Sequence, residues 1–524
     1  MTHRSIAKSA SVIGVATLGS RILGFLRDVV IAKFFGTALF AQAFVVAFRI
    51  PNLLRDVVGE GATNAAFVPV LSEYRAKKTP KEYWELAAVL FKLLSLALLA
   101  LTLLGVIFAP LIVRLIAPGF IADALKLSLT IKLTRIMFPY IFLIGLSAYA
   151  MGVLNSLKHF AVPAWGPSLL NIAMILSAIY LGPRLGEPVM ALAIGVLLGG
   201  ILQLGSNLPV LIAKGFRFRF KEKPDLGHAG AKKVLKLLLP RALGTCVYQA
   251  STFVDIIMAS LSGIVGDGGV AALYYSNRII QFPMAIFGVS LAQAALPTMS
   301  EHASLNDFGK LRQTLSFSLR GILLIMIPSS VGLLILGRPI IRMLFERGQF
   351  DVYSTNITAS ALFFYAFGLF AYAGVKVLVG AFYSMQDTLT PVKTASVALC
   401  ANVILNLALM FPLKIGGIAL ATSIAASLNF LMLWVILRKK IGTIGGRRII
   451  TSLVKMLSAS FCMGIICFSF SRGLFETMAD MHITLRLFAL CLVLSASIAA
   501  YVGACFLFKV EEMKEAIKWV LKKS

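Results

Sequence analysis

The sequence predicts an all-α protein that crosses a membrane many times, and two observations carry that prediction. Hydrophobic residues fill 59% of the 524 positions and the mean hydropathy is +0.89, whereas soluble domains contain roughly 45–50% apolar residues. Apolar runs of about 20 residues, the length that spans a bilayer, recur from one end of the chain to the other. A β-barrel would instead show alternating apolar and polar residues.

Taken in order along the chain, these runs predict fourteen membrane spans. Their expected limits are 8–34, 39–70, 84–113, 128–156, 163–182, 188–213, 233–262, 269–298, 314–336, 356–384, 390–412, 416–437, 450–471 and 483–508. The tail from Lys509 carries lysines at helical spacing and predicts a short amphipathic helix. Its lysines are Lys514, Lys518, Lys522 and Lys523.

Basic residues gather in the loops that follow even-numbered spans. They include Arg75, Lys77, Lys78, Lys81, Lys214, Arg217, Arg219, Lys221, Lys223, Arg438, Lys439, Lys440, Arg447 and Arg448. The other loops are poorer in basic residues, apart from Arg338, Arg342 and Arg347. Because cytoplasmic loops are rich in Lys and Arg, we expect both termini in the cytoplasm. No signal-peptide cleavage pattern is present, so the first helix is expected to stay.

The composition also argues against several function classes. The net charge of +28 is explained by cytoplasmic loops, and no basic-aromatic module outside the membrane suggests a nucleic-acid partner. The six cysteines lie in apolar stretches without C-x-x-C spacing, and the five histidines are scattered, so neither a disulfide framework nor a zinc site is expected. No P-loop sequence occurs. We expect a protein that is not an enzyme.

An internal repeat divides the predicted spans. With an offset of 228 residues, Pro69-x-x-Ser72-Glu73 matches Pro297-x-x-Ser300-Glu301, and further landmarks coincide across six spans. Each half holds an even number of spans, so the halves are parallel repeats, an arrangement typical of transporters with a site between the halves. We expect an N-terminal lobe at 1–220 and a C-terminal lobe at 221–440. Spans 13 and 14, with the tail, fall outside the repeat at 441–524.

Charged residues within the first two spans form a duplicated motif. Residues 21–28 read RILGFLRD and residues 49–56 read RIPNLLRD. An arginine at the bilayer centre costs about 2.5–3.5 kcal/mol on insertion scales, so these side chains are expected to face a wet cavity, a partner or the interface. Residues seven apart share a helix face, and each Arg-Asp pair is either a structural clamp or part of an anion site. Guanidinium groups fit phosphate bidentately, which favours a phosphate or pyrophosphate headgroup.

The second half differs at the equivalent positions, where Gln249 replaces Arg21 and Asp255 replaces Arg27. Asp255 is alone in an apolar span, and Asn402 and Asn406 lie one helical turn apart on another. Oxygen atoms of Asp, Asn and Thr are ligands that a small hard cation takes. These residues therefore suggest a sodium or proton site, and the alternative is that the two asparagines hold neighbouring helices together.

Several stretches of the chain resemble the MurJ (MviN) family of lipid II flippases. They are SRILGFLRDVVIAKFFG from Ser20, AFRIPNLLRDVVGEGATNAAFVPVLSEY ending at Tyr74, APGF at 117–120, YYSNRIIQFP at 274–283 and FYSMQDTLTPVK at 382–393. The resemblance covers essentially the whole chain. It implies fourteen helices in two six-helix lobes with a last pair that forms a groove for the lipid tail, in the multidrug/oligosaccharidyl-lipid/polysaccharide exporter superfamily.

The resemblance also implies site residues. The cavity arginines of the family fall on Arg21, Arg27, Arg55 and Arg278, and acids of the same motifs fall on Asp28 and Glu60. Arg49 and Asn52, in the second copy of the motif, complete the candidate substrate site. A sodium site of the family would fall on Asp255, Asn402, Asn406, Ile418 (through its carbonyl) and Thr422. The chain departs from some relatives in carrying Gln42, Asn277, Gln281 and Asn406 where acids occur, which makes the cavity more positive and weakens the case for sodium.

Together these features predict a flippase that carries lipid II from the inner to the outer leaflet of the bacterial cytoplasmic membrane by alternating access, for peptidoglycan synthesis. Sodium, protons or the membrane potential would drive the cycle. We expect a monomer in contact with membrane lipids, near the enzymes of wall synthesis. The alternatives are a flippase for another polyprenyl-linked oligosaccharide, a cation-coupled drug exporter, a membrane-embedded glycan polymerase or transferase, and an inactive scaffold for other wall enzymes.

Overall fold

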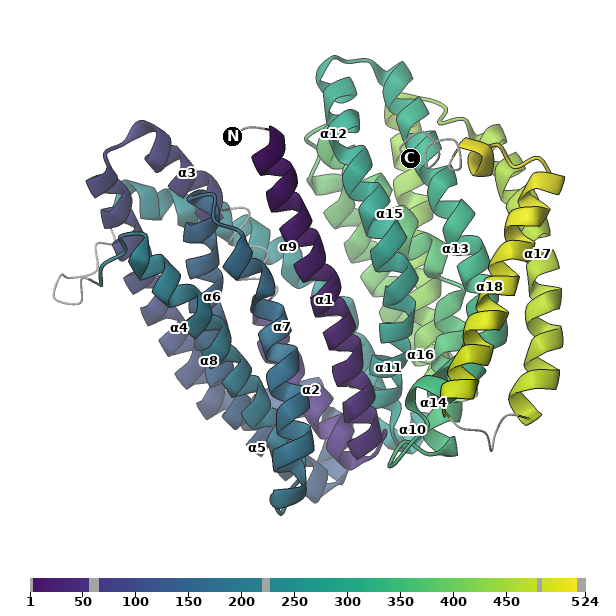
Figure 1. Ribbon diagram of the computed structural model, residues 1–524, viewed down its shortest axis with the longest axis horizontal. Coiled ribbons are helices and arrows are strands. Elements are labelled where there is room, and N and C mark those ends of the chain that lie inside the picture. The colour runs from purple at the N-terminus through teal and green to yellow at the C-terminus, as the bar shows by residue number, and fades with distance from the viewer. Residues whose placement is uncertain (1–2, 56–65, 219–226, 478–482, 516–524) are drawn as a thin grey trace. The chain divides into compact units, whose positions relative to one another are not determined.

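Helices make up all the regular structure that the computed structural model describes, which is residues 3–55, 66–218, 227–477 and 483–515 (Figure 1). The predicted all-α class is therefore confirmed. The chain divides into two compact units, Met1–Leu261 and Ser262–Ser524. Glu60 and the tail lysines Lys518, Lys522 and Lys523 lie outside the described residues.

The residues that the structure describes in the first unit form nine α-helices, α1 to α9, joined in places by short helical segments. The α-helices are α1 (His3–Phe35), α2 (Leu39–Arg55), α3 (Val68–Lys77), α4 (Pro80–Ile116), α5 (Ala124–Met137), α6 (Pro139–Ser156), α7 (Ala161–Leu176), α8 (Met190–Ala213) and α9 (Ala229–Ala259). The short segments are η2 (Pro118–Ala122), η3 (Ser177–Leu181) and η4 (Gly182–Arg184).

The second unit begins with the short helix α10. Its helices are α10 (Ser262–Val265), α11 (Gly269–Pro283), α12 (Ser290–Ser304), α13 (Phe308–Phe345), α14 (Val352–Ala366), α15 (Leu369–Ser384), α16 (Leu389–Ile441), α17 (Gly446–Thr477) and α18 (Ile483–Leu507), with η5 (Met284–Val289) joining α11 to α12. Figure 1 shows α17 and α18 beside α13, at the C-terminal end of the colour scale.

Within the described residues, nine helical stretches are long and apolar enough to cross a bilayer, or ten if α14 and α15, bent by 47°, form one span. The structure thus has the character of a multi-pass membrane protein. Part of the difference from fourteen arises because α16 joins two predicted spans across Lys414, whose φ of 50° and ψ of −130° interrupt the helix. The predicted boundary between 412 and 416 falls at that break.

Local chemistry accounts for where long helices begin. The Thr79 hydroxyl accepts a hydrogen bond from the Glu82 backbone N–H, and the Glu82 carboxylate accepts one from the Thr79 backbone N–H at 2.9 Å. This reciprocal cap, followed by a proline at the first helical position, satisfies the free N–H groups that start α4. Asp307 and Asp351 cap α13 and α14 with their side chains, which accept hydrogen bonds from the backbone N–H groups of Lys310 and Ser354.

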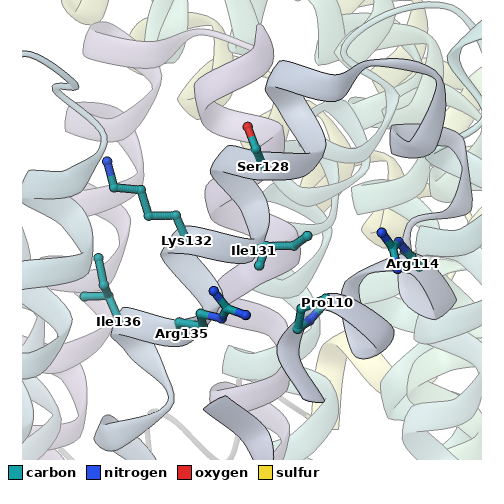
Figure 2. Close-up of a pocket in the computed structure, with 7 residues that line it drawn as sticks. All are labelled: Pro110, Arg114, Ser128, Ile131, Lys132, Arg135 and Ile136. Atoms are coloured by element: carbon teal, nitrogen blue, oxygen red, sulfur yellow. The ribbon is translucent and has the colours of Figure 1, made fainter. Parts of the chain in front are cut away.

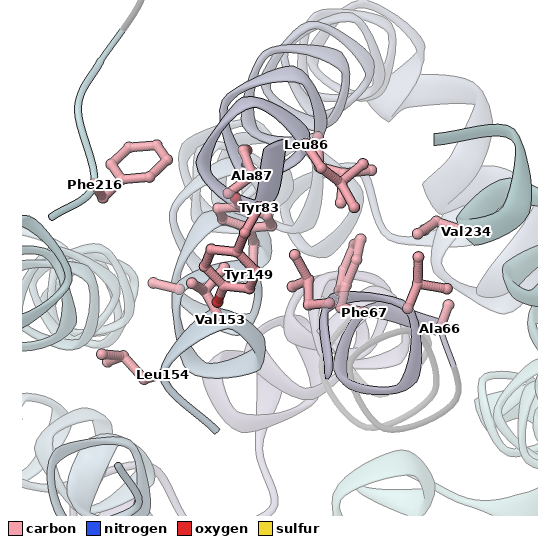
Figure 3. Packing of buried hydrophobic residues seen from close by; sticks show 14 of the residues in the cluster. Ala66, Phe67, Tyr83, Leu86, Ala87, Tyr149, Val153, Leu154, Phe216 and Val234 are labelled. Atoms are coloured by element: carbon pink, nitrogen blue, oxygen red, sulfur yellow. Dashed lines mark hydrogen bonds between the residues drawn. The ribbon is translucent and has the colours of Figure 1, made fainter. Parts of the chain in front are cut away.

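The core of the first unit joins α3, α4, α6 and α9 (Figure 3). Phe67, Tyr83 and Tyr149 are almost fully buried there, and Val234 brings α9 against them. The Tyr149 hydroxyl donates to the Ala87 carbonyl at 2.5 Å, so the polar end of this buried ring is satisfied. These contacts hold α9 within the compact unit that ends at Leu261.

Small residues let helices approach closely where lipid removes the hydrophobic driving force between helices. A Cβ added at Gly199 of α8 would lie 2.8 Å from the Leu170 Cα of α7. A side chain at this position would force the two helices apart, which makes glycine a requirement of the α7–α8 packing.

In the second unit, α17 and α18 pack on α13 through a separate core. The Tyr501 hydroxyl of α18 donates to the Leu324 carbonyl of α13 at 2.8 Å, and Met456 and Val493 are fully buried between these helices. The two helices match the predicted last pair of spans. In the structure they belong to the second unit, since they extend its core.

Candidate functional site

The first copy of the duplicated motif lies on α1 and forms a buried polar cluster with α7. The Arg27 Nε and one Nη donate to Asp28 Oδ1 at 3.0 and 2.7 Å. The other Nη donates to Asn171 Oδ1 at 3.0 Å. Only 6% of Arg27 and 1% of Asp28 is exposed. The guanidinium is therefore a buried, charge-paired group that links α1 to α7.

A glycine on α1 allows α7 to approach closely at this cluster. A Cβ added at Gly24 would lie 3.4 Å from Asn171 Nδ2, a tight contact. Asn171 Nδ2 in turn donates to the Ser20 carbonyl at 3.1 Å. Asn171 thus binds both the backbone of α1 and its arginine. Sequence reasoning missed Asn171, since it lies 144 positions from Arg27.

Arg21 lies on α1 seven residues before Asp28, and its side chain is exposed. It forms no hydrogen bond or ion pair with any residue that the structure describes. The helical spacing placed Arg21 and Asp28 on one face, whereas the contacts just described join Asp28 to its neighbour Arg27. A side chain as long as arginine can fold back along the helix to an adjacent carboxylate, and helix periodicity alone does not capture this.

The second copy of the motif ends α2. Arg49 is half-buried and its Nη2 donates to Gln249 Oε1 of α9 at 2.8 Å. Asn52 and Arg55 are also half-buried on the last turns of this helix. Gln249 is the residue that the repeat aligns with Arg21, and its amide is neutral. The bond therefore ties Arg49 of α2 to α9.

Arg278 lies on α11 of the second unit. Its guanidinium carbon lies 5.0 Å from the centroid of the Tyr274 ring, and its Nη2 donates to the Tyr274 hydroxyl at 3.2 Å. Next to it, Gln281 Nε2 donates to Asn277 Oδ1 at 2.5 Å. The stacking aligns the planar fork of the arginine. Residues four apart on a helix are neighbours. The spacing of Tyr274 and Arg278 therefore indicated this contact, although the sequence prediction did not use it.

The candidate cation ligands of the second unit lie together across the break in α16. Asn402 Nδ2 donates to Thr422 Oγ1 at 3.3 Å, and Asn406 Nδ2 donates to Asn402 Oδ1 at 3.2 Å. Thr422 Oγ1 donates to the Ile418 carbonyl at 3.0 Å. Both asparagines are fully buried. Four of the five predicted ligands thus form one hydrogen-bonded group.

The chain reverses at Lys414 to bring these residues together. A Cβ added at Gly417 would lie 2.1 Å from the Leu409 carbonyl oxygen, so only glycine permits this backbone approach. Asp255, the predicted charged ligand, is 94% buried on α9 of the first unit. The described residues contain no group of three or more His, Cys, Asp or Glu that could hold a metal ion. A cation bound to the α16 group would be held by amide, hydroxyl and carbonyl oxygens.

The motif at 382–393 provides a polar contact outside the spans. Asp387 accepts hydrogen bonds from the Thr390 backbone N–H at 3.0 Å and from the Thr390 hydroxyl at 2.6 Å, and it forms an ion pair with Lys440. Burial opposes ionisation of Asp387, but the hydrogen bonds from Lys440 and Thr390 outweigh it and hold the pKa of this carboxyl below its usual range. The aspartate starts the first half of α16 and ties it to the end of the second half.

Comparisons with known proteins agree on one family. The family model described as lipid II flippase MurJ matches residues 31–489. The chain is 36% identical over 423 residues to a probable lipid II flippase MurJ of Buchnera aphidicola from the pea aphid, Acyrthosiphon pisum, covering 80% of this chain and 81% of the relative. It is 36% identical over 426 residues to the lipid II flippase MurJ of Burkholderia cenocepacia, covering 81% and 82%.

The solved structures lead to the same family. An inward closed conformation of lipid II flippase MurJ matches with a TM-score of 0.77 and 30% identity, over 96% of this chain and 99% of that one. An inward-facing multidrug transporter of the MATE family matches with a TM-score of 0.67 over 81% of this chain and 95% of that one. At 14% identity, the second likeness concerns the fold alone.

Proposed function

The chain belongs to the MurJ family of lipid II flippases, and from this premise we propose how its residues carry out the transport. It is a multi-pass protein of the inner membrane and a transporter of lipid II, not an enzyme. Lipid II is the polyprenyl-pyrophosphate-linked precursor of peptidoglycan, so the chain serves cell-wall synthesis. The observation that carries this conclusion is the match to the MurJ structure over 96% of the chain.

We propose that Arg21, Arg49, Arg55 and Arg278 bind the pyrophosphate of lipid II during an alternating-access cycle. Three features support this. Arg21 is exposed on α1, and the guanidinium groups of Arg49 and Arg278 donate to the neutral Gln249 amide and Tyr274 hydroxyl. Stacking on Tyr274 orients the Arg278 fork, and an oriented fork binds a diphosphate with little loss of side-chain freedom.

Arg27 takes a different part in this scheme. Its charge is compensated by Asp28 and its position is fixed by Asn171. We propose that the Arg27–Asp28 pair fixes the position of α1. Arg21 then keeps its position relative to the other phosphate-binding groups. Under this proposal the loss of Arg27 stops transport through a shift of α1, and the loss of Arg21 stops it through weaker substrate binding.

The cycle requires an energy source, for which we propose the membrane potential with sodium or a proton as the coupling ion. A site with excess arginine is positively charged when empty, and a potential that is negative inside favours its return, by about 2.3 kcal/mol per charge per 100 mV. The asparagine-threonine group on α16, with Asp255, is the proposed ion site. The lack of a carboxylate at Asn406 favours weak ion binding, since fewer charged ligands lower affinity.

The remaining architecture is proposed from the sequence pattern. Twelve of fourteen spans would form two parallel six-span lobes at 1–220 and 221–440, and spans 13 and 14 would follow at 441–524. Both termini would lie in the cytoplasm. The polyprenyl tail would lie along α17 and α18, whose surfaces carry exposed Phe461 and Phe488. We further propose that the protein works as a monomer near the enzymes that use lipid II.

Complementation tests the arginine roles. A bacterium depleted of its own flippase receives wild type, Arg21→Ala, Arg278→Ala or the control Arg184→Ala, at matched levels in the membrane. Arg184 is an exposed arginine in the short helix η4, so its loss changes net charge equally. Rescue by wild type and the control, with failure of the other two, supports the proposal. Rescue by all four would remove Arg21 and Arg278 from the substrate site.

A further inference from the structure

A pocket of about 580 Å³ opens on the surface of the first unit between α4 and α5 (Figure 2), and no residue of the duplicated motif is among its lining residues. Pro110 and Arg114 of α4 line one wall, and residues from Ser128 to Ile136 of α5 line the other. In Figure 2, Pro110 lies between the two arginines of the pocket, Arg114 and Arg135. Three cationic side chains, counting Lys132, border this one space.

The spacing on α5 explains why these side chains share the pocket. Ser128, Lys132 and Arg135 recur at intervals of four and three, which puts them on one face of the helix. Leu129 and Leu133, on the other face, are buried against the rest of the unit. The packed face of α5 also buries the polar residues Lys126, Thr130 and Thr134. Lys132 and Arg135 place two cations on its exposed face.

The surface around the pocket nevertheless exposes apolar side chains that can contact lipid chains. Ile107, Leu111 and Leu115 on α4 and Leu125 on α5 are each more than half exposed. Arg114 also lies far along α4 from the capped start of the helix at Pro80, by about 50 Å at 1.5 Å per residue. The pocket thus sits near a membrane face, within a surface that meets lipid chains.

The charges of the pocket are only partly compensated. Lys132 forms an ion pair with Glu187 at 2.8 Å. Neither Arg114 nor Arg135 has a hydrogen bond or an ion pair with any residue that the structure describes, and both are exposed. Arginines at a lipid-facing surface are unfavourable without an anion or water to solvate them. The ligand that meets both conditions, an anion and an apolar rim, is an anionic amphiphile.

We propose that this pocket binds the phosphate headgroup of an anionic phospholipid. Arg114 and Arg135 donate to the phosphate oxygens from two helices, and the acyl chains lie along the exposed leucines and isoleucines of α4. A space of about 580 Å³ is large enough to admit a glycerophosphate headgroup. The proposal concerns a site apart from the transport arginines, and it holds whether or not their roles are as stated above.

Native mass spectrometry of the purified full-length protein tests this site. The delipidated protein is titrated with phosphatidylglycerol or with neutral phosphatidylethanolamine, for wild type, Arg114→Gln/Arg135→Gln and Arg184→Gln. All three substituted arginines are exposed, so folding should be preserved, and thermal melting curves verify this. We expect one phosphatidylglycerol to bind wild type and Arg184→Gln alike. The double variant should bind it at least tenfold more weakly, since two charge-assisted contacts are lost.

Each other outcome contradicts a part of the proposal. Equal affinity of wild type and the double variant for phosphatidylglycerol would show that the two arginines do not bind this lipid. Equal loss in Arg184→Gln would show a general charge effect. Displacement of the lipid by inorganic phosphate at a similar concentration would show a simple anion site. Displacement by lipid II, seen in wild type and absent in the double variant, would make the transported lipid the occupant and overturn the assignment to phospholipid.

Discussion

Removal of the Asp28 carboxylate should destabilise the protein strongly, because this carboxylate is ion-paired with a buried arginine. Asp28→Ala removes two charge-assisted hydrogen bonds, at 3.0 and 2.7 Å, from a guanidinium that is only 6% exposed. Such bonds contribute about 1.5–3 kcal/mol each, and loss of one partner of a buried pair costs about 3–5 kcal/mol. We therefore expect the free energy of unfolding to fall by about 3–5 kcal/mol.

Denaturation in detergent micelles, followed by tryptophan fluorescence, measures this effect. Trp165 of α7 is a local reporter, since its ring lies 3.6 Å from the Cβ position of Gly19 on α1. The double variant Arg27→Ala/Asp28→Ala should recover at least about 1 kcal/mol relative to Asp28→Ala, because it buries no unpaired charge. Arg21→Ala is the control and should change stability by less than about 0.5 kcal/mol. Wild-type stability in Asp28→Ala would refute the buried-pair account.

Three further predictions follow from the packing and the loops. Gly417→Ala should lower the melting temperature, because its Cβ would lie 2.1 Å from a backbone carbonyl oxygen at the reversal in α16. Gly446→Ala is the control and should leave the melting temperature unchanged, because nothing lies within 4 Å of its Cβ position. Glu512→Ala should leave Arg320 without its ion-pair partner and release the C-terminal segment, seen as faster hydrogen exchange at 509–515, and unchanged exchange would contradict this. Because the pKa of Asp387 is lowered in the folded state, the stability advantage of wild type over Asp387→Asn should stay constant from about pH 8 to pH 5 and shrink only below about pH 4; a loss near pH 6 would contradict the assignment.

Composition and periodicity predicted the helical class and many helix limits, because a bilayer demands long apolar helices with satisfied backbone groups. The end of one span at 412 and the start of the next at 416 agree with the break at Lys414. The packing of α9 against α3 and α4 did not follow from these patterns. An offset of 228 residues relates elements by ancestry, whereas compactness depends on side chains such as Val234 that pack against α3 and α4.

The candidate site shows the same limit. Helical spacing related Asn402 to Asn406, and the family resemblance added Thr422 from the next span. In the structure Asn402 hydrogen-bonds to both of the other side chains. Helical spacing did not identify the partners of the arginines. Asn171 and Gln249 are far from those arginines in sequence, so their contacts depend on the packing of α1 with α7 and of α2 with α9. No local pattern reports such packing.

The central claim is that exposed arginines hold the pyrophosphate while lipid II crosses, and flipping in reconstituted vesicles tests it most directly. Fluorescently labelled lipid II is placed in the inner leaflet, a potential is applied, and a membrane-impermeant quencher records its arrival outside. The account predicts rapid arrival with wild type and with Arg184→Ala, and a rate at least tenfold lower with Arg21→Ala, at unchanged melting temperature. An equal rate for Arg21→Ala and wild type would contradict the claim.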